Sequence, residues 1–421
     1  MSKRKQRKFA MLASGVAVLL GVQSAWVAAQ EEDEQSPFSF SVSQTFSWDD
    51  NMYRLPDGEP PRDGSDRSDV VSNTSVGINF DKTYSRQSFH AGISATHSVY
   101  RKHSNLDNTA PDANLRWDWR AGDRWSGVLG YGWSESFVGF ENTYGYYNAQ
   151  QEKVMHRLSR ANASADFWWH PNWATGFSFS DVRSDYRDDA RQFDQYEAQQ
   201  VSLNLTYRPS TGNRVVFSLR GEEGLYLNRK KKEELVPGET SLRDWERYDA
   251  QVSAQWQLTG ATKLSGYTGY TQRKYDLASN RDFSGVTGKI ALNWMPSGKA
   301  IVDLSWRREI GADADYVSNY AVTQGWALQP TWVISSKVRL GATFEYLDRD
   351  YGGDPGYPAA EINPREAKTT AYGLNLQYMP TPNANIALGY RQQKRESDKE
   401  IYDSIYGFDA RTVWLSGSLS F

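Results

Sequence analysis

The chain is built largely from short segments in which apolar and polar residues alternate. The segment from Tyr248 to Leu258 shows this most clearly: its even positions hold Tyr, Ala, Val, Ala, Trp and Leu, and its odd positions hold Asp, Gln, Ser, Gln and Gln. Successive side chains of a strand point to opposite faces, so the pattern predicts strands with one apolar and one polar face. These segments show no competing helix periodicity, and the sequence therefore predicts an all-β protein.

The alternating segments run from 38–48 near the amino end to 413–421 at the carboxyl end. We expect about 18 strands, with about 16 as the alternative count because the segment 264–270 is weak and rich in glycine. In the sixth segment, 154–169, the apolar parity switches between Leu158 and Ala161. That switch predicts a β-bulge at this point.

The connections between these segments alternate in length. Every second connection is a tight turn built from residues that turns favour, such as Gly122-Asp123, Thr259-Gly260 and Ser335-Ser336. The intervening connections are longer and polar, and they include 49–66, 228–243, 348–365 and 393–406. A soluble β-sandwich has no reason for this regularity. The pattern is typical of a transmembrane antiparallel up-and-down β-barrel, with short periplasmic turns and longer extracellular loops.

The aromatic residues sort by strand end. Aromatic residues make up 14% of the chain, although the mean hydropathy of −0.71 is too low for helical membrane spans. Tryptophans lie beside the short turns and tyrosines lie toward the long connections: Trp125, Trp169, Trp173, Trp256, Trp294 and Trp332, against Tyr131, Tyr248, Tyr270, Tyr320, Tyr346 and Tyr390. Two such girdles are expected where amphipathic rings settle at the two faces of a lipid bilayer.

The amino terminus has the pattern of an export signal. Basic residues at 3–8 precede an apolar run at 9–22 that is too short to span a membrane, and Val27-Ala28-Ala29 offers small residues for cleavage. We therefore expect a signal peptide at 1–29, a short periplasmic lead at 30–36 and a single barrel domain at 37–421. The chain has no cysteine, which excludes a lipid anchor on a cysteine after the signal. The predicted location is the bacterial outer membrane, with lipid around the barrel.

The polar parity of the strands is predicted to line the lumen. It carries the arginines that we take as candidate substrate-binding residues: Arg116, Arg120, Arg157, Arg160, Arg214, Arg220, Arg247, Arg307, Arg339 and Arg391. Fewer acidic residues share this parity, and an arginine excess would favour anionic solutes. The alternative is that arginines and carboxylates pair and simply keep a wet interior rigid. The net charge of −3 gives no reason to expect a nucleic-acid partner.

Enzyme chemistry has little support in the sequence. The chain has five histidines; His103 lies in a connection and His156 lies on a nominally lipid-facing position. No Ser–His–carboxylate spacing singles out either one. The run Asp49-Asp50-Asn51 offers oxygen ligands for a divalent cation, but the same residues are favoured as simple turn formers. We predict no catalytic site, no metal site and no cofactor.

Three stretches carry a family resemblance. They are Trp48-Asp-Asp-Asn-Met-Tyr-Arg-Leu-Pro56, Gly77-Ile-Asn-Phe-Asp-Lys-Thr-Tyr-Ser-Arg-Gln87 and Arg208-Pro-Ser-Thr-Gly-Asn-Arg214. The first two resemble the amino-terminal signatures of EpsL-type outer-membrane proteins, and the third is similar to an internal turn of that group. The resemblance covers about residues 38–421. It implies an outer-membrane barrel associated with exosortase and exopolysaccharide biosynthesis systems, and it assigns no individual site residues.

The expected function follows from the barrel together with this resemblance. We expect an outer-membrane channel that exports a biofilm-type or capsule-type exopolysaccharide, with periplasmic and inner-membrane synthesis and export components as partners. The arginine-rich lumen indicates an acidic polymer. The main alternative is a general or sugar-selective diffusion porin, and a further one is a structural or adhesive barrel that acts through its long loops.

Overall fold

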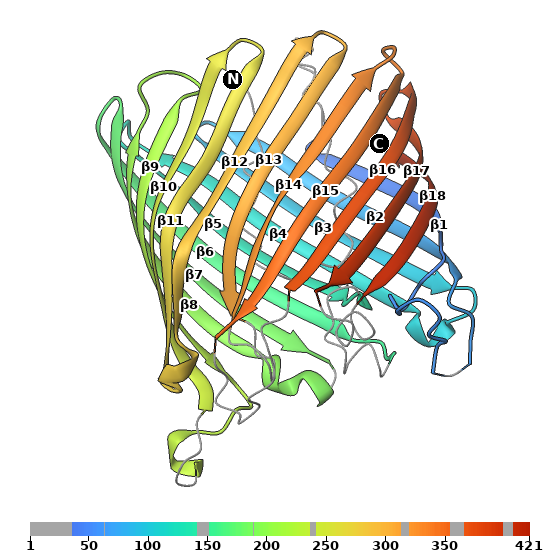
Figure 1. Ribbon diagram of the computed structural model, residues 1–421. Helices are drawn as coiled ribbons and strands as arrows, with labels where there is room; N and C mark the ends of the chain where they lie inside the picture. The colour runs from blue at the N-terminus through green and yellow to red at the C-terminus, as the bar shows by residue number, and fades with distance from the viewer. Residues whose placement is uncertain are drawn as a thin grey trace.

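The computed structural model describes residues 36–62, 64–140, 151–187, 189–235, 241–312, 320–353, 366–398 and 407–421. These residues form one closed antiparallel barrel of 18 strands (Figure 1). The strands are β1 Phe38–Asp49, β2 Asp69–Tyr84, β3 Gln87–Tyr100, β4 Asn108–Ala121, β5 Trp125–Phe137, β6 Met155–His170, β7 Trp173–Tyr186, β8 Tyr196–Tyr207, β9 Arg214–Tyr226, β10 Ser241–Thr259, β11 Thr262–Leu277, β12 Phe283–Ser297, β13 Ala300–Ala312, β14 Tyr320–Val333, β15 Val338–Gly352, β16 Glu366–Thr381, β17 Ala384–Ser397 and β18 Phe408–Ser420.

Each strand pairs with its neighbours in sequence, and β1 also pairs with β18. The register across this seam runs from Ser41 opposite Ser420 to Asp49 opposite Thr412. At its end, Phe40 and Phe421 exchange backbone hydrogen bonds of 3.0 and 2.9 Å. Closure leaves no strand edge, which is the condition that a sheet must meet inside a bilayer. The predicted fold class and the predicted count of 18 strands are confirmed.

One parity of the strands forms an exposed apolar surface. Ile93, Leu203 and Leu219 are 69%, 58% and 63% exposed, as expected for side chains that face lipid rather than a protein core. The tryptophans and tyrosines of the two predicted girdles share this outward parity. Among the described residues, no helix is long and apolar enough to cross a membrane.

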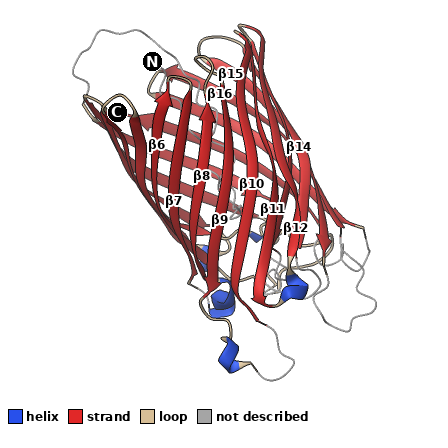
Figure 2. Cartoon of the chain, turned by 90° about the vertical axis from the view of Figure 1, so that its left-hand side faces the viewer, coloured by secondary structure: helices blue, strands red, loops and turns tan. Residues whose placement is uncertain are grey.

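Short and long connections lie at opposite ends of the barrel (Figures 1 and 2). The short turns join β2 to β3 and each later even-numbered strand to the next odd-numbered one. The long connections carry the short 3₁₀ helices η1 (Ser104–Leu106), η3 (Asp189–Asp194), η4 (Lys232–Glu234) and η5 (Ser279–Arg281). We call the end that carries these helices the long-loop rim. The predicted signal peptide at 1–29 lies outside the described residues, and so does the predicted lead apart from residue 36.

The β-bulge predicted in the sixth strand is wrong. The register between β5 and β6 is unbroken from Phe137 opposite Met155 to Trp125 opposite Phe167. The outward parity therefore continues to Arg157, which was predicted to face the lumen, and His156 faces inward instead. Near the long-loop rim, Arg157 bonds Glu135 at 3.3 Å and lies over the ring of Trp133. Because Glu135 and Trp133 contact Arg157 on the outer face near the rim, Arg157 can point outward and the strand needs no bulge.

Removal of Phe421 tests the seam. The variant loses the backbone pair between Phe421 and Phe40 of β1 and the aromatic side chain at this end of the seam. We expect a several-fold fall in folded barrel in the outer membrane, measured as the fraction that shifts in mobility on heating before gel electrophoresis. Phe421→Tyr is the control and keeps both features. Equal amounts of folded barrel in the deletion and the control would contradict the prediction.

Candidate functional site

The inner face of the barrel carries nine of the ten arginines predicted to line the lumen. The strand register places them on the parity opposite the exposed apolar surface; they are Arg116, Arg120, Arg160, Arg214, Arg220, Arg247, Arg307, Arg339 and Arg391. Arg157 is the exception, for the reason given above. Contact between any of these side chains and a solute stays a prediction.

At least four of the inward arginines form ion pairs with carboxylates on the same face. Arg116 bonds Asp118 at 2.7 Å, and Arg391 lies 3.1 Å from Glu345. The other two, on β9 and β10, share one carboxylate, as described next. Pairing of this kind orients the guanidinium groups and stiffens the wall, which was the alternative interpretation of the arginine-rich parity.

The shared carboxylate belongs to Asp249. Arg247 lies 3.0 Å from it and Arg220 lies 3.7 Å from it. The Thr271 hydroxyl also donates a hydrogen bond to this carboxylate. Two guanidinium groups thus converge on one carboxylate, and Glu222 lies opposite Arg247 in the strand register on the same inner face.

An aromatic cluster packs against the inner face at the long-loop rim. It consists of Trp245, Tyr275, Ala198 and Ala278, flanked by Tyr196 and Tyr226. The Arg273 guanidinium lies 3.8 Å from the ring centre of Trp245 and 5.1 Å from that of Tyr275. Such contacts hold the guanidinium group against the ring faces, and the cluster covers the inner side of the sheet here.

Sequence reasoning missed this cluster. It assigned aromatic residues mainly to the lipid-facing girdles, and it did not select Arg273 or the further inward cations Arg243, Lys263 and Arg349. Parity offered a signal, because Trp245 and Tyr275 lie on odd positions whereas the apolar parity of β10 and β11 is even.

A second apolar cluster lies at another sector of the same rim. Tyr53 and Leu55 of the β1–β2 connection, Leu106 of η1 and Phe140 pack against Val71 and Tyr100. Val71 and Tyr100 are on the inward parity of β2 and β3, so these loop segments lie against the lumen side of the wall. Tyr53 is 1% exposed and meets Phe140 edge to face at 4.8 Å. Long loops therefore narrow the mouth of the barrel at this sector.

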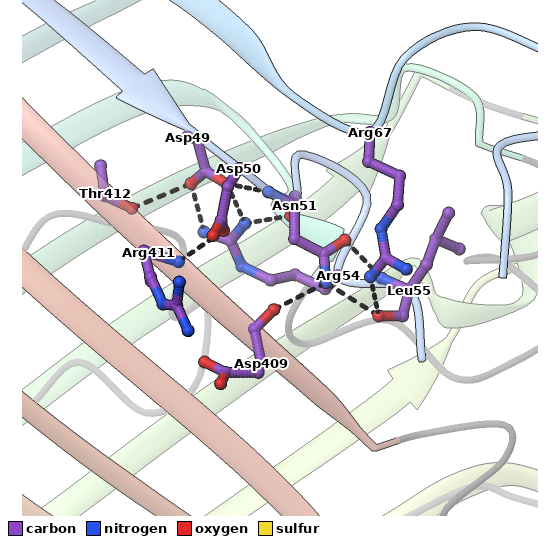
Figure 3. Close-up of polar contacts among 9 residues, drawn as sticks. All are labelled: Asp49, Asp50, Asn51, Arg54, Leu55, Arg67, Asp409, Arg411 and Thr412. Carbon is purple, nitrogen blue, oxygen red and sulfur yellow. Dashed lines mark hydrogen bonds and ion pairs between the residues drawn. The ribbon is translucent and has the colours of Figure 1, made fainter. Parts of the chain in front are cut away.

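The stretch Trp48 to Pro56, which carries the family resemblance, holds this loop in place (Figure 3). Asn51 is 1% exposed; its side chain accepts from Leu55 N at 2.9 Å and donates to Leu55 O at 2.8 Å and to Asp409 O at 2.9 Å. The Asp49 carboxylate binds both terminal nitrogens of Arg54 at 2.8 Å and accepts from the Thr412 hydroxyl at 2.9 Å. These contacts fasten the first loop to the last strand.

The same contacts engage the side chains of Asp49, Asp50 and Asn51, which the sequence offered as oxygen ligands for a divalent cation. The Asp50 carboxylate accepts from Arg411 N at 2.6 Å, so each of the three side chains already has protein partners. Within the described ranges, no group of three or more His, Cys, Asp or Glu side chains is placed to hold a metal ion. Nearby, the hydrogen bond from Lys102 lowers the pKa of the Asp66 carboxyl.

The family model described as "Putative beta-barrel porin 2" matches residues 38–415, which is most of the chain. The chain belongs to this porin family. It is a porin-like β-barrel channel of the bacterial outer membrane.

Solved structures with a similar fold include one protein of Acinetobacter baumannii and one of Pseudomonas aeruginosa. OccAB3 of Acinetobacter baumannii is 8% identical, with a TM-score of 0.49 over 91% of this chain and 99% of that chain. OpdK of Pseudomonas aeruginosa, solved with vanillate, is 10% identical, with a TM-score of 0.48 over 91% of this chain and 99% of that chain. A comparison with curated proteins finds no match.

Charge removal tests the electrostatics of this porin's lumen. Substitution of Arg220, Arg247 and Arg339 by Gln removes three positive charges and leaves Asp249 without its two arginines. We expect the preference for anions to be lost or reversed, measured as the reversal potential in planar bilayers under a KCl gradient. Arg157→Gln is the control, because it removes one arginine charge from the outer face and none from the lumen. Unchanged selectivity in the triple variant would show that the inner arginines do not set it.

Asn51→Ala tests the fastening of the first loop. The change leaves the buried backbone N–H of Leu55 without its partner, at a cost of about 1–3 kcal/mol, and removes the hydrogen bonds to Leu55 O and Asp409 O. We expect faster hydrogen–deuterium exchange at 50–56, with the strands still protected. Asp57→Ala, an exposed change in the same loop, should leave the exchange unaltered. Equal protection in both variants would rule out a fastening role for Asn51.

Proposed function

We propose that this porin-like channel exports an exopolysaccharide from the periplasm to the cell surface. The observation that carries the proposal is the chemistry of the inner wall, which combines arginines with hydroxyl and amide side chains. Ser75 bonds Thr96 at 2.7 Å, and Ser178 bonds Ser202 at 2.6 Å. Groups that both donate and accept can exchange hydrogen bonds with the hydroxyls of a sugar chain as it moves.

The charge of the wall favours an acidic or acid-substituted polymer. The Arg220 and Arg247 guanidinium groups both lie at the carboxylate of Asp249, and the inner parity holds more arginines than the acidic residues predicted to share it. A guanidinium group can bind a carboxylate or phosphate through two parallel hydrogen bonds. Each acidic group of the moving polymer would bind one such arginine, dissociate from it and bind the next.

The direction of transport rests on the resemblance to EpsL-type proteins at Trp48 to Pro56. That resemblance implies that the barrel belongs to an exopolysaccharide system with periplasmic and inner-membrane components. A passive conduit fits such a system, because polymer synthesis and pushing from within supply the driving force. The barrel itself then needs only a wet, hydrogen-bonding path.

A second candidate function is inward diffusion of small sugars. The clusters around Tyr53 and Trp245 favour it, because both pack against the inner wall at the long-loop rim and reduce the opening there. A narrow mouth suits selection among small solutes better than passage of a bulky polymer.

Deletion of the gene separates the two functions. Under the export proposal, the mutant loses extracellular polysaccharide, measured as acid-precipitable or dye-binding polymer in the medium, while uptake of labelled small sugars stays normal. Restoring the gene on a plasmid should restore the polymer. A mutant that secretes normal amounts of polymer would overturn the export proposal, and a selective loss of sugar uptake would favour the diffusion porin.

A further inference from the structure

Two long loops and the start of β2 bring a serine, a histidine and an aspartate into one hydrogen-bonded chain at the long-loop rim. Ser65 belongs to the β1–β2 connection, Asp69 is the first residue of β2, and His103 precedes η1 in the β3–β4 connection. Asp69 Oδ2 lies 2.7 Å from His103 Nδ1, and His103 Nε2 lies 3.0 Å from Ser65 Oγ.

The direction of the hydrogen bonds follows from the chemistry of the groups. A carboxylate only accepts, so in the neutral His103 ring the proton sits on Nδ1 and points to Asp69. Nε2 is then left with its lone pair toward Ser65, whose hydroxyl donates to it. This is the arrangement in which an imidazole can take the proton of a serine hydroxyl during nucleophilic attack.

The aspartate and the histidine are held rigidly. Each is 1% exposed. The Asp69 carboxylate also accepts from the backbone N–H groups of Val70, Lys102 and His103 at 2.7, 3.0 and 3.0 Å. The ring of Tyr53 packs perpendicular to His103 at 5.0 Å. The ring orientation is therefore set before any substrate arrives, as catalysis of this type requires.

Ser65, in contrast, is half-buried and opens onto a cavity of about 480 Å³ in the first loop. The cavity is lined by Asp50, Gly58, Glu59, Pro60, Pro61, Ser65, Asp66, Arg67 and Ser68. Burial of the base and its carboxylate, combined with an accessible hydroxyl, distinguishes a site that can react from a purely structural contact.

The chain offers an internal comparison on β6 and β7. His156 Nε2 lies 2.8 Å from Ser184 Oγ, which gives a second serine–histidine pair. Both residues are buried, at 5% and 2% exposure, and no carboxylate is bonded to the His156 ring in the described part of the chain. That pair lacks an orienting acid and is buried on both sides, whereas His103 is bonded to Asp69 and Ser65 is half-buried in the lining of a cavity.

We propose that Ser65, His103 and Asp69 form a hydrolase site for short-chain carboxylic esters, an activity independent of the proposed export. Ser65 Oγ attacks the ester carbonyl carbon while His103 Nε2 takes the hydroxyl proton. The carbon–oxygen bond to the alcohol then breaks, and the alcohol leaves with that proton. Water, deprotonated by His103, attacks the acyl-serine, releases the carboxylic acid and restores Ser65. Asp69 is a positioning residue that stabilises the protonated ring.

The lining of the cavity sets the substrate class. Apart from Gly58 and two prolines it presents charged and hydroxyl side chains, so it suits an acetyl-sized acyl group and offers no apolar slot for a fatty acyl chain. Arg67 lines the same cavity, and backbone carbonyls of Leu55 and Pro56, both 2.9 Å away, hold its guanidinium. Its held positive charge favours the negative oxygen that develops on the ester carbonyl.

The experiment uses the full-length folded barrel in detergent, with p-nitrophenyl acetate and p-nitrophenyl palmitate as probes. A fluorophosphonate serves as a covalent label, and mass spectrometry locates it. We expect labelling at Ser65 and hydrolysis of the acetate ester. Ser65→Ala should remove the label and lower the hydrolysis rate by at least about 10³-fold. Asp69→Asn should lower kcat with little change in KM, because Asp69 does not touch the substrate.

Ser184→Ala is the matched control, because it removes the other serine–histidine contact and should leave both label and rate unchanged. Heat-dependent mobility on gels shows that each variant is folded. An unlabelled Ser65 in the native protein, or equal rates in the native protein and Ser65→Ala, would overturn the proposal. Faster hydrolysis of the palmitate ester would overturn the short-chain assignment.

Discussion

The structure depends on the backbone hydrogen bonds that join β1 to β18. In hydrocarbon, each unpaired N–H or C=O group costs several kcal/mol, so an open sheet of these strands would not persist in a membrane. The seam from Ser41 and Ser420 to Asp49 and Thr412 removes that penalty for both terminal strands at once. Once the ring is closed, the apolar parity faces lipid, the polar parity encloses the lumen, and the long loops gather at one rim.

Most of the fold could be predicted because its signals are local. A period of two specifies the faces of a strand, and the turn residues mark where each strand ends. The placement of Arg157 could not be predicted in this way, because parity alone does not report depth in the membrane. The switch of the apolar parity between Leu158 and Ala161 was interpreted as a bulge, whereas the strand keeps its register and Arg157 lies outward near the long-loop rim beside Glu135.

The sites at the long-loop rim lay beyond sequence reasoning for a different reason. Ser65 and His103 come from separate connections, and no periodic pattern relates their positions. Asn51 meets the backbone of Asp409, which is 358 residues further along the chain. Resemblance marked the stretch around Asn51 as distinctive without giving a cause. The contacts supply one, because the stretch fastens a loop that narrows the mouth and also contains the cavity beside Ser65.

The fastening of the first loop to the last strand ties the order of assembly to the completeness of the barrel. Asp50 makes two hydrogen bonds with the backbone of Arg411: its amide nitrogen donates to Arg411 O, and its carboxylate accepts from Arg411 N. The Arg411 backbone lies beside the loop only when β18 has been synthesised and has paired with β1. The first loop can therefore make these contacts only in a barrel whose first and last strands have paired.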